Sequence, residues 1–359
     1  MESLQNLNLS GCSKLKKFPE TEEASRDREN MEKLKKLPDD MGSLQCLVKL
    51  KANGTGIQEV PTSITLLTKL EVLSLAGCKG GESKLRNLAL SLRASPTDGL
   101  RLSFWPFLCP LKKLNLSDCN LLEGALPSDL SSLSWLECLD LSRNSFITVP
   151  SLSRLPRLER LILEHCKSIR SLPELPSSIE ELLANDCISL ETISNPSSAY
   201  TGRKSVHLNF EFFNCFRLVE NEQSDNVEAI LWRIRLLVSI PNFVAPSNIR
   251  YNAVVPGSSI PEWFIHQSAG CLVPVELPPH WYNTKLMGLA VCAVFNAHIT
   301  MGELDELGFS ANESGSFYID DTASMHFSKA DHIWFGYRPL WGSGGNQSNT
   351  LKVSFSIYI

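Results

Sequence analysis

The sequence lacks the motifs that identify most enzymes and nucleotide switches. Among its 359 residues there is no GxxxxGKS or GxxxxGKT phosphate loop, no HExxH metal motif and no GxSxG nucleophile elbow. Its 7 histidines never stand four residues apart, and its 11 cysteines include no CxxC pair, so the sequence disfavours a zinc site. We therefore expect no catalytic activity and no cofactor.

Long apolar runs and a strong charge of one sign are also missing. The most apolar stretch, Leu286 to Phe295, has about half of the roughly 20 residues that a membrane-spanning helix needs. The N-terminus carries no apolar segment of signal-peptide type. A formal net charge of −5 gives no overall basic field for nucleic acid or anionic membranes. The sequence predicts a cytoplasmic protein, with the nucleus as a second location, that binds neither nucleic acid nor membrane.

The first half is organised by a repeated leucine pattern, LxxLxLxxC or LxxLxLxxN. Regular copies begin at Leu4, Leu70, Leu111, Leu136, Leu158 and Ile179, and a degenerate copy begins at Leu47. The last four copies begin 25, 22 and 21 residues apart, which lies within the range of about 20–29 residues for leucine-rich repeats. Each copy would form a short parallel strand that buries its leucines only by stacking on its neighbours. This pattern predicts an α/β leucine-rich-repeat solenoid over 1–194, with irregular insertions near 21–32 and 80–110.

The residue that ends each copy should turn into the core, where its polar group can satisfy backbone left unpaired at the bend. Six residues would form this ladder: Cys12, Cys78, Cys119, Asn144, Cys166 and Cys187. Because the cysteines occupy one fixed position of the repeat, we interpret them as buried thiols rather than as disulfides or metal ligands.

Charged residues beside the inward leucines should lie on the concave side of the solenoid. The candidate partner-binding residues are Lys49, Lys51, Lys112, Lys113, Glu137, Asp140, Arg143, Glu159, Arg160, Glu164, His165, Glu180, Glu181 and Asp186. Lysines come first and acids dominate the later repeats, which predicts an electrically polarised surface that selects a protein partner. The alternative is that these charges only keep an exposed sheet soluble.

The second half has a different texture. The leucine pattern stops after 194, and the Asn-Pro-Ser-Ser stretch indicates a linker over 195–206. Apolar residues at helical spacing predict an amphipathic helix near 225–238, whose apolar face would dock on the core more often than form a groove. Short strand-like runs follow at 271–277, 286–295, 316–319, 332–337 and 351–359. We expect a second domain over 207–359 that is an all-β sandwich of jelly-roll or Ig-like type with this one helix.

Several motifs in both halves resemble the C-terminal half of plant immune receptors of the TIR-type, nucleotide-binding, leucine-rich-repeat class. They are LPELPSSI at 172–179, FNCFRL at 213–218, VPGSSIPEWF at 255–264, LPPHW at 277–281, GLAVC at 288–292 and DHIWFGY at 331–337. The later motifs resemble the post-repeat jelly-roll/Ig-like (C-JID) domain of that class. The resemblance implies a recognition module that binds a pathogen effector, or a host protein altered by one, and contributes to defence.

Three further expectations follow from the resemblance. Pro256, Gly257, Ile260, Pro261, Glu262 and Trp263 would either anchor the post-repeat domain or belong to the recognition surface. The absence of a phosphate loop means that the nucleotide switch, and with it the TIR domain, is not carried over, although those domains of a full receptor are candidate partners. Met1 opens inside a repeat without a polar capping unit, so we expect a fragment: a truncated gene product, a partial gene model or one piece of a longer receptor.

Two other readings of the sequence compete with immune recognition. A glycosidase-like or calcium site could be formed by adjacent acids, namely Asp320-Asp321 or Glu303 with Asp305 and Glu306. A sugar-binding surface could be formed by Trp263, Trp281, Trp334 and Trp341. Adjacent acids more often form a solvated turn, and sandwich tryptophans more often pack in the core. A generic leucine-rich-repeat inhibitor or scaffold acting outside the cell would require a secretion signal.

Overall fold

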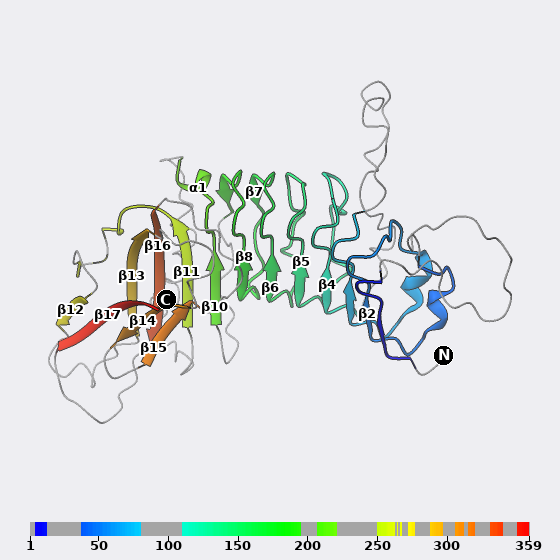
Figure 1. Ribbon diagram of the computed structural model, residues 1–359, viewed down its shortest axis with the longest axis horizontal. Helices are drawn as coiled ribbons and strands as arrows, with labels where there is room; N and C mark the ends of the chain where they lie inside the picture. The colour runs from blue at the N-terminus through cyan, green and yellow to red at the C-terminus, as the bar shows by residue number, and fades with distance from the viewer. Residues whose placement is uncertain are drawn as a thin grey trace, which may run out of the picture. The chain divides into compact units, whose positions relative to one another are not determined.

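The computed structural model divides the chain into two compact units, Met1–Ala199 and Tyr200–Ile359 (Figure 1). The residues that it describes are 4–12, 37–79, 110–194, 207–220, 250–262, 264, 266–267, 272–276, 288–296, 306–311, 315–319, 331–339 and 350–358. The insertions predicted near 21–32 and 80–110, the linker at 195–206 and the helix near 225–238 lie outside these residues, apart from residue 110. No helix in the described part is long and apolar enough to cross a membrane.

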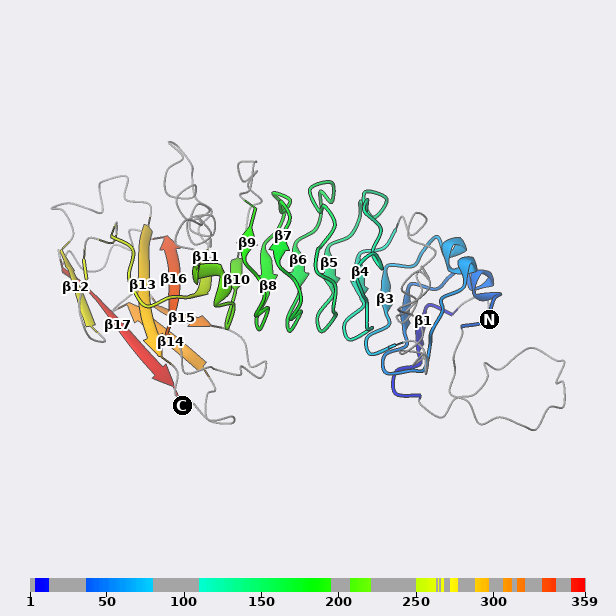
Figure 2. The same ribbon diagram turned by 90° about the horizontal axis from the view of Figure 1, so that it is seen from above.

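The first unit is the predicted repeat solenoid. Each repeat contributes one short strand to a parallel sheet whose order is β1 (Asn6–Asn8), β2 (Lys49–Lys51), β3 (Val72–Ser74), β4 (Lys113–Asn115), β5 (Cys138–Asp140), β6 (Arg160–Ile162) and β8 (Glu181–Leu183). The central leucines are paired from strand to strand, from Leu7 opposite Leu50 to Leu161 opposite Leu182. Figures 1 and 2 show these strands side by side along the array.

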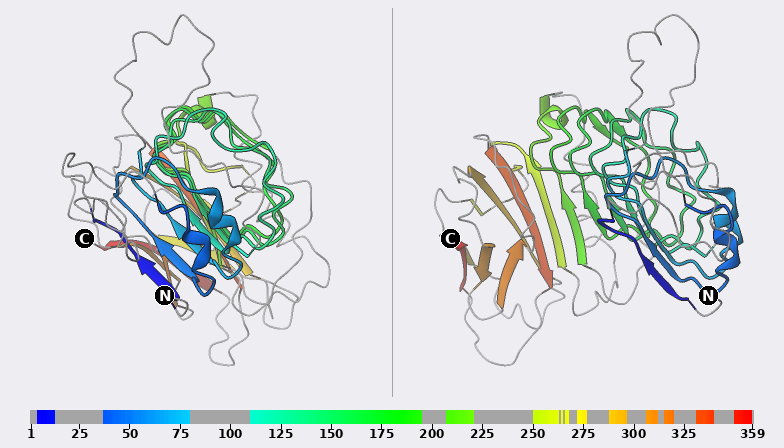
Figure 3. Two further views of the ribbon diagram at one scale, coloured as in Figure 1. Left: turned by 90° about the vertical axis from the view of Figure 1, so that its right-hand side faces the viewer. Right: turned by 45° about the vertical axis from the view of Figure 1, so that its right-hand side comes forward.

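The segments that return from one strand to the next contain no α-helix among the described residues of this unit. They hold the 3₁₀-helices η1 (Met41–Ser43) and η2 (Thr62–Leu66) and a two-stranded parallel sheet of β7 (Ser171–Leu172) and β9 (Thr192–Ile193). The α/β description is therefore wrong for these returns. Prolines such as Pro127, Pro150 and Pro173 favour extended backbone there. Seen along the array, the strands line one side of the coil and the returns close the other (Figure 3).

The ladder residues tie neighbouring repeats together through the core. Each buried thiol donates to a carbonyl of the preceding repeat: Cys78 to Ala52 (3.3 Å), Cys119 to Leu75 (3.1 Å), Cys166 to Leu141 (3.3 Å) and Cys187 to Leu163 (3.1 Å). Burial raises the pKa of the Cys119 thiol to about 12, which keeps it protonated as a donor. The carbonyl groups that end each strand are thus satisfied by the next repeat along the chain.

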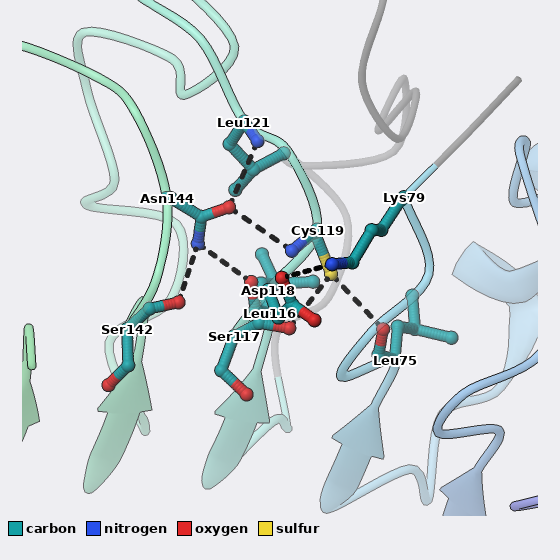
Figure 4. A network of polar contacts seen from close by, with 9 residues as sticks. All are labelled: Leu75, Lys79, Leu116, Ser117, Asp118, Cys119, Leu121, Ser142 and Asn144. Atoms are coloured by element: carbon teal, nitrogen blue, oxygen red, sulfur yellow. Dashed lines mark hydrogen bonds and ion pairs between the residues drawn. The ribbon is translucent and has the colours of Figure 1, made fainter. Parts of the chain in front are cut away.

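Asn144 occupies the equivalent ladder position and also bonds the backbone of the preceding repeat, with stronger hydrogen bonds (Figure 4). Its Nδ2 donates to the carbonyls of Leu116 (2.9 Å) and Leu141 (2.8 Å). Its Oδ1 accepts the backbone N–H groups of Cys119 (3.2 Å) and Leu121 (2.9 Å). One amide therefore donates to two carbonyls and accepts two N–H groups, whereas a thiol has a single, weakly donating S–H.

Cys12 is an exception to the expected ladder, because its side chain is exposed rather than buried. The other ladder thiols donate to a carbonyl of the repeat that precedes them. The described residues contain no repeat before the one that holds Cys12, and so no carbonyl that its thiol could reach as the other ladder thiols do. The prediction of a buried thiol at this position is wrong for the structure described.

The residue before each ladder position adopts a left-handed backbone conformation. The φ angles are 73° at Gly11, 65° at Gly54, 74° at Gly77, 53° at Asp118, 59° at Arg143, 57° at His165 and 60° at Asp186. This turn points the following ladder side chain back into the core. Glycine, aspartate and histidine adopt left-handed backbone more readily than most residues. Arg143 does not share that preference.

The second unit is built mostly of strands, arranged in two sheets. One has the order β10 (His207–Glu211), β11 (Arg250–Pro256), β16 (Asp331–Pro339) and β13 (Gly288–Asn296), with β10 parallel to β11 and the other pairs antiparallel. The other is antiparallel, with the order β12 (Leu272–Glu276), β17 (Thr350–Tyr358), β14 (Glu306–Ala311) and β15 (Gly315–Ile319). The described helix is α1 (Arg217–Glu220). The sequence analysis predicted neither β11 nor β14.

Residues 207–215 are a further copy of the repeat pattern that the sequence analysis did not identify. Asn214 has a left-handed φ of 60°, and the N–H of the following Cys215 donates to the carbonyl of Phe212 (3.3 Å). The same bond joins Cys78 to Leu75 in the first unit (3.1 Å). Phenylalanines at 210 and 212 replace the leucines of the pattern, which explains why a search for leucine spacing misses this copy.

We predict that Asn144→Leu destabilises the first unit by about 3 kcal/mol. The change keeps the side-chain volume similar but leaves two buried N–H groups and the Leu116 carbonyl without a partner, at about 1–3 kcal/mol for each group that stays unsatisfied. The Leu141 carbonyl keeps the Cys166 thiol as a donor. The free energy of unfolding in urea measures the loss. Cys119→Ala is the control and should lose only about 1 kcal/mol, since a thiol bond is weak. Equal losses in the two variants would contradict the assigned role of Asn144.

We predict that Gly336→Ala destabilises the second unit. A Cβ at Gly336 would lie against the indole of Trp334, which is fully buried on the same strand and cannot swing away. Overpacking of this kind costs about 1–3 kcal/mol. The thermal unfolding of the second unit, followed by tryptophan fluorescence, checks the expectation. Restored stability in Gly336→Ala combined with Trp334→Phe would support the steric cause, and an unchanged transition in Gly336→Ala alone would refute it.

Candidate functional site

The candidate surface is the face of the first unit's sheet that points away from the leucine core. Alternation along a strand places the residues before and after each central leucine on this face. We call the first set the pre-leucine column: Asn6, Lys49, Val72, Lys113, Cys138, Arg160 and Glu181. The second set is the post-leucine column: Asn8, Lys51, Ser74, Asn115, Asp140, Ile162 and Leu183. Together they form what we call the open face.

The structure distributes the fourteen predicted residues over the open face and its two borders. Six lie in the columns: Lys49, Lys51, Lys113, Asp140, Arg160 and Glu181. Lys112, Glu137, Glu159 and Glu180 stand just before the strands, at one border. Arg143, Glu164, His165 and Asp186 follow the strands, at the other border. Pre-leucine Val72 and Cys138, which complete the column, were not among the predicted residues because they carry no charge.

Equivalent polar residues of neighbouring repeats pair sideways. Lys112 bonds Glu71 (Nζ to Oε1, 2.9 Å), Arg160 bonds Glu181 (Nε to Oε2, 2.8 Å) and His165 bonds Asp186 (Nδ1 to Oδ2, 3.2 Å). Amides likewise donate to acids, from Asn115 to Asp140 (2.8 Å) and from Asn185 to Glu164 (3.3 Å). The Glu71 carboxylate raises the pKa of Lys112, and burial raises the pKa of Glu180. Many of the acids are therefore engaged within the sheet.

The exposed charges of this surface are positive. Lys49, Lys51, Lys113, Arg143 and Arg160 are exposed, whereas every acid among the predicted residues is half-buried. Within the described residues, Lys49, Lys51 and Lys113 make no ion pair. The sequence predicts that lysines and acids are separated along the array. The structure adds a difference in exposure, because the cations are exposed and the acids are half-buried against the sheet.

Trp135 and Arg157 form an exposed pair that the sequence analysis did not identify. They occupy the position before the first leucine of successive repeats, beside the border that holds Lys112 and Glu137. The Arg157 guanidinium lies 3.7 Å from the centroid of the Trp135 ring, and Trp135 keeps 45% of its surface exposed. Tryptophan and arginine are enriched among the residues that contribute most to protein binding. The sequence could have indicated Trp135, because other repeats have Lys69, Pro110 or Ser178 at this position.

The post-repeat motif is partly structural and partly exposed. Pro256 is buried at the end of β11, and the N–H of Gly257 donates to the carbonyl of Asp331 (3.0 Å). A Cβ at Gly257 would collide with Ile333. Ile260 and Pro261 are half-buried, whereas Ser258, Ser259 and Glu262 are exposed. Trp263 lies outside the described residues.

Motifs from distant parts of the second unit meet at His332. Its Nε2 accepts the backbone N–H of Asn214 (3.2 Å), so this nitrogen carries no proton. The rings of Phe213 and Phe216 lie 5.4 Å and 5.8 Å from the imidazole, which is fully buried. The FNC and DHIWFGY motifs therefore form one packed core.

The described residues give little support to the hypotheses of a glycosidase-like site, a calcium site or a sugar-binding surface. They contain no group of three or more His, Cys, Asp or Glu side chains that could hold a metal ion. Trp334 is fully buried, so it cannot line a sugar-binding surface. Trp281, Trp341 and the Asp320-Asp321 pair lie outside the described residues.

Comparison with known proteins agrees with the two kinds of unit. Residues 255–355 match the C-JID domain family, and residues 110–133 match the Leucine Rich Repeat family. A leucine-rich-repeat protein of Leptospira interrogans is a structural neighbour with 18% identity and a TM-score of 0.32, covering 58% of this chain and 52% of its own. One segment of each unit of the chain thus matches one of these two families.

Its relatives in sequence are plant disease resistance proteins of the TIR-type nucleotide-binding, leucine-rich-repeat class, along nearly its whole length. It is 30% identical to disease resistance-like protein DSC1 of Arabidopsis thaliana, over 98% of this chain and 26% of that protein. It is 31% identical to disease resistance protein RPS4 of the same plant, over 94% and 31%. It is 30% identical to TMV resistance protein N of Nicotiana glutinosa, over 99% and 29%. The chain spans about a quarter to a third of the length of these relatives.

We predict that Glu181→Gln changes the free energy of unfolding by at most about 1 kcal/mol. The Arg160–Glu181 pair is partly exposed, with 47% and 27% of the two side chains accessible, and such pairs contribute little to stability. Urea unfolding of the variant checks this. A loss of several kcal/mol would show instead that the sideways pairs hold the solenoid together.

Proposed function

We propose that this chain is the protein-recognition part of a plant immune receptor that acts in the cytoplasm, with the nucleus as a second location. It binds a pathogen effector, or a host protein altered by one, and so contributes to defence. The observation that carries the proposal is the open face, on which Lys49, Lys51 and Lys113 are exposed without an ion pair among the described residues. The resistance proteins related to the chain support the same role.

The partner is a protein rather than a small molecule or a nucleic acid. The open face extends over seven strands, a surface suited to a macromolecule. The net charge of −5 disfavours binding of nucleic acid to the chain. A partner is therefore attracted only by local charge complementarity at the open face. Charge arranged on a rigid sheet determines which partner docks and how fast, more than how tightly it binds.

The two parts have different tasks in this proposal. The solenoid over 1–194 presents the main contact surface, and a linker over 195–206 joins it to a domain over 207–359. We propose that the two sheets of that domain pack as a jelly-roll/Ig-like sandwich with a helix near 225–238, and that the exposed residues Ser258, Ser259 and Glu262 add a second contact. The matched families are recognition modules, so we propose no enzymatic activity. The TIR and nucleotide-binding domains of a full receptor are further candidate partners.

The proposal is tested by proximity labelling of the chain in leaf cells during infection. The variant Lys113→Glu reverses an exposed charge of the open face, and Lys167→Glu reverses an exposed lysine outside both columns. We expect pathogen or host proteins that are labelled by the wild type and by Lys167→Glu but lost with Lys113→Glu, and that then bind the purified chain directly. The same labelled proteins with both variants would reject the open face as the recognition surface.

A further inference from the structure

The pre-leucine column alternates between cations and small uncharged residues. From β2 to β6 it reads Lys49, Val72, Lys113, Cys138, Arg160, each opposite the next in the sheet register. The three cations are exposed, whereas Val72 and Cys138 are half-buried. Neighbouring strands lie about 4.8 Å apart, so cations on every second strand recur about every 9.6 Å.

An extended chain in the polyproline II conformation has nearly the same period. It has three residues per turn and a rise of about 3.1 Å, so every third residue returns to the same side after about 9.3 Å. The mismatch with the cation spacing stays below about 1 Å over two intervals. A β-strand repeats its face after about 6.7 Å, and an α-helix repeats it after seven residues or about 10.5 Å, which accumulates about 2 Å of mismatch.

We propose that the pre-leucine column binds an acidic segment of the partner protein in an extended, polyproline II-like conformation, with a carboxylate at every third residue. The carboxylates would bind Lys49, Lys113 and Arg160. The shorter, uncharged side chains of Val72 and Cys138 would lie between these cations. The segment runs across the strands, along the array. This inference rests on the proposed function, because it assigns the partner chemistry to the same open face.

The acids near the column keep their negative charge but are less exposed to a partner than Lys49 and Lys113. Both carboxylate oxygens of Asp140 are occupied, by Asn115 (2.8 Å) and by the hydroxyl of Ser142 (2.7 Å). Glu181 bonds Arg160, which weakens the third cation for a partner. Glu71 is held by Lys112 at the border (2.9 Å). Lys49 and Lys113 are therefore the principal anchors.

The test measures fluorescence anisotropy of labelled peptides with the purified full chain. The probe contains three repeats of Glu-Pro-Pro, and a composition-matched peptide places the same three glutamates together at one end. We expect the spaced peptide to bind at least about tenfold more tightly, a difference of about 1.4 kcal/mol, and to weaken as salt is raised. Lys113→Glu should lose about tenfold in affinity for it, and Lys113→Arg and Lys167→Glu should keep it.

Four outcomes would overturn the inference. Three are equal binding of the clustered peptide, equal binding of a helical peptide with glutamate at every seventh residue, and equal or tighter binding of a single-stranded oligonucleotide. The fourth is an unchanged affinity in Lys113→Glu. If the spaced peptide fails while Lys113→Glu still loses its partners in leaf cells, the open face remains the recognition surface and only the extended acidic ligand is rejected.

Discussion

The hydrogen bonds made inside the core where each strand ends determine the rest of this solenoid. At this bend the Leu75 carbonyl accepts the N–H of Cys78 from its own turn (3.1 Å) and takes a second donor from the next repeat, and a buried backbone group left unpaired is costly. The Cys119 thiol donates to the Leu75 carbonyl (3.1 Å), and the Asn144 amide bonds backbone groups of two repeats. Because each ladder residue reaches backward by one repeat, the register between repeats is fixed. The left-handed turn just before the ladder follows from the same need.

Fixed register in the core dictates what the open face can be. Equivalent positions of successive repeats stand opposite one another, so charges form columns, and acids and bases of the same column pair sideways, as Arg160 does with Glu181 (2.8 Å). These pairs hold the acids close to the sheet and leave lysines such as Lys49 and Lys113 projecting outward. The exposed charge of the surface is thus a consequence of the spacing of the repeat, and a partner meets it as a regular array.

The sequence predicts the solenoid well and the surface less well, for different physical reasons. Burial of leucines at a fixed period is a local constraint that leaves a clear pattern, and the structure places Leu73 and Leu139 in the core accordingly. The copy at 207–215 escaped because phenylalanine fills the same space as leucine. Sideways pairing and the stacking of Arg157 on Trp135 depend on which neighbour stands opposite, which no single repeat encodes. The exposure of Cys12 likewise depends on which neighbouring repeats the structure describes rather than on its own motif.

The division between core and surface explains how one scaffold can serve recognition. In a repeat array, stability is close to a sum over repeats and their interfaces, and here those terms come from buried leucines and ladder bonds. Side chains of the open face add little to that sum, since exposed pairs contribute at most about 1 kcal/mol each. They can therefore change without loss of the fold. In the second unit, by contrast, Gly336 leaves no room for a Cβ beside Trp334, and His332 is fully buried against Phe213 and Phe216, so the motif they form has little freedom to vary. Variation in partner choice is accordingly easier to accommodate on the pre-leucine and post-leucine columns than in the post-repeat motifs.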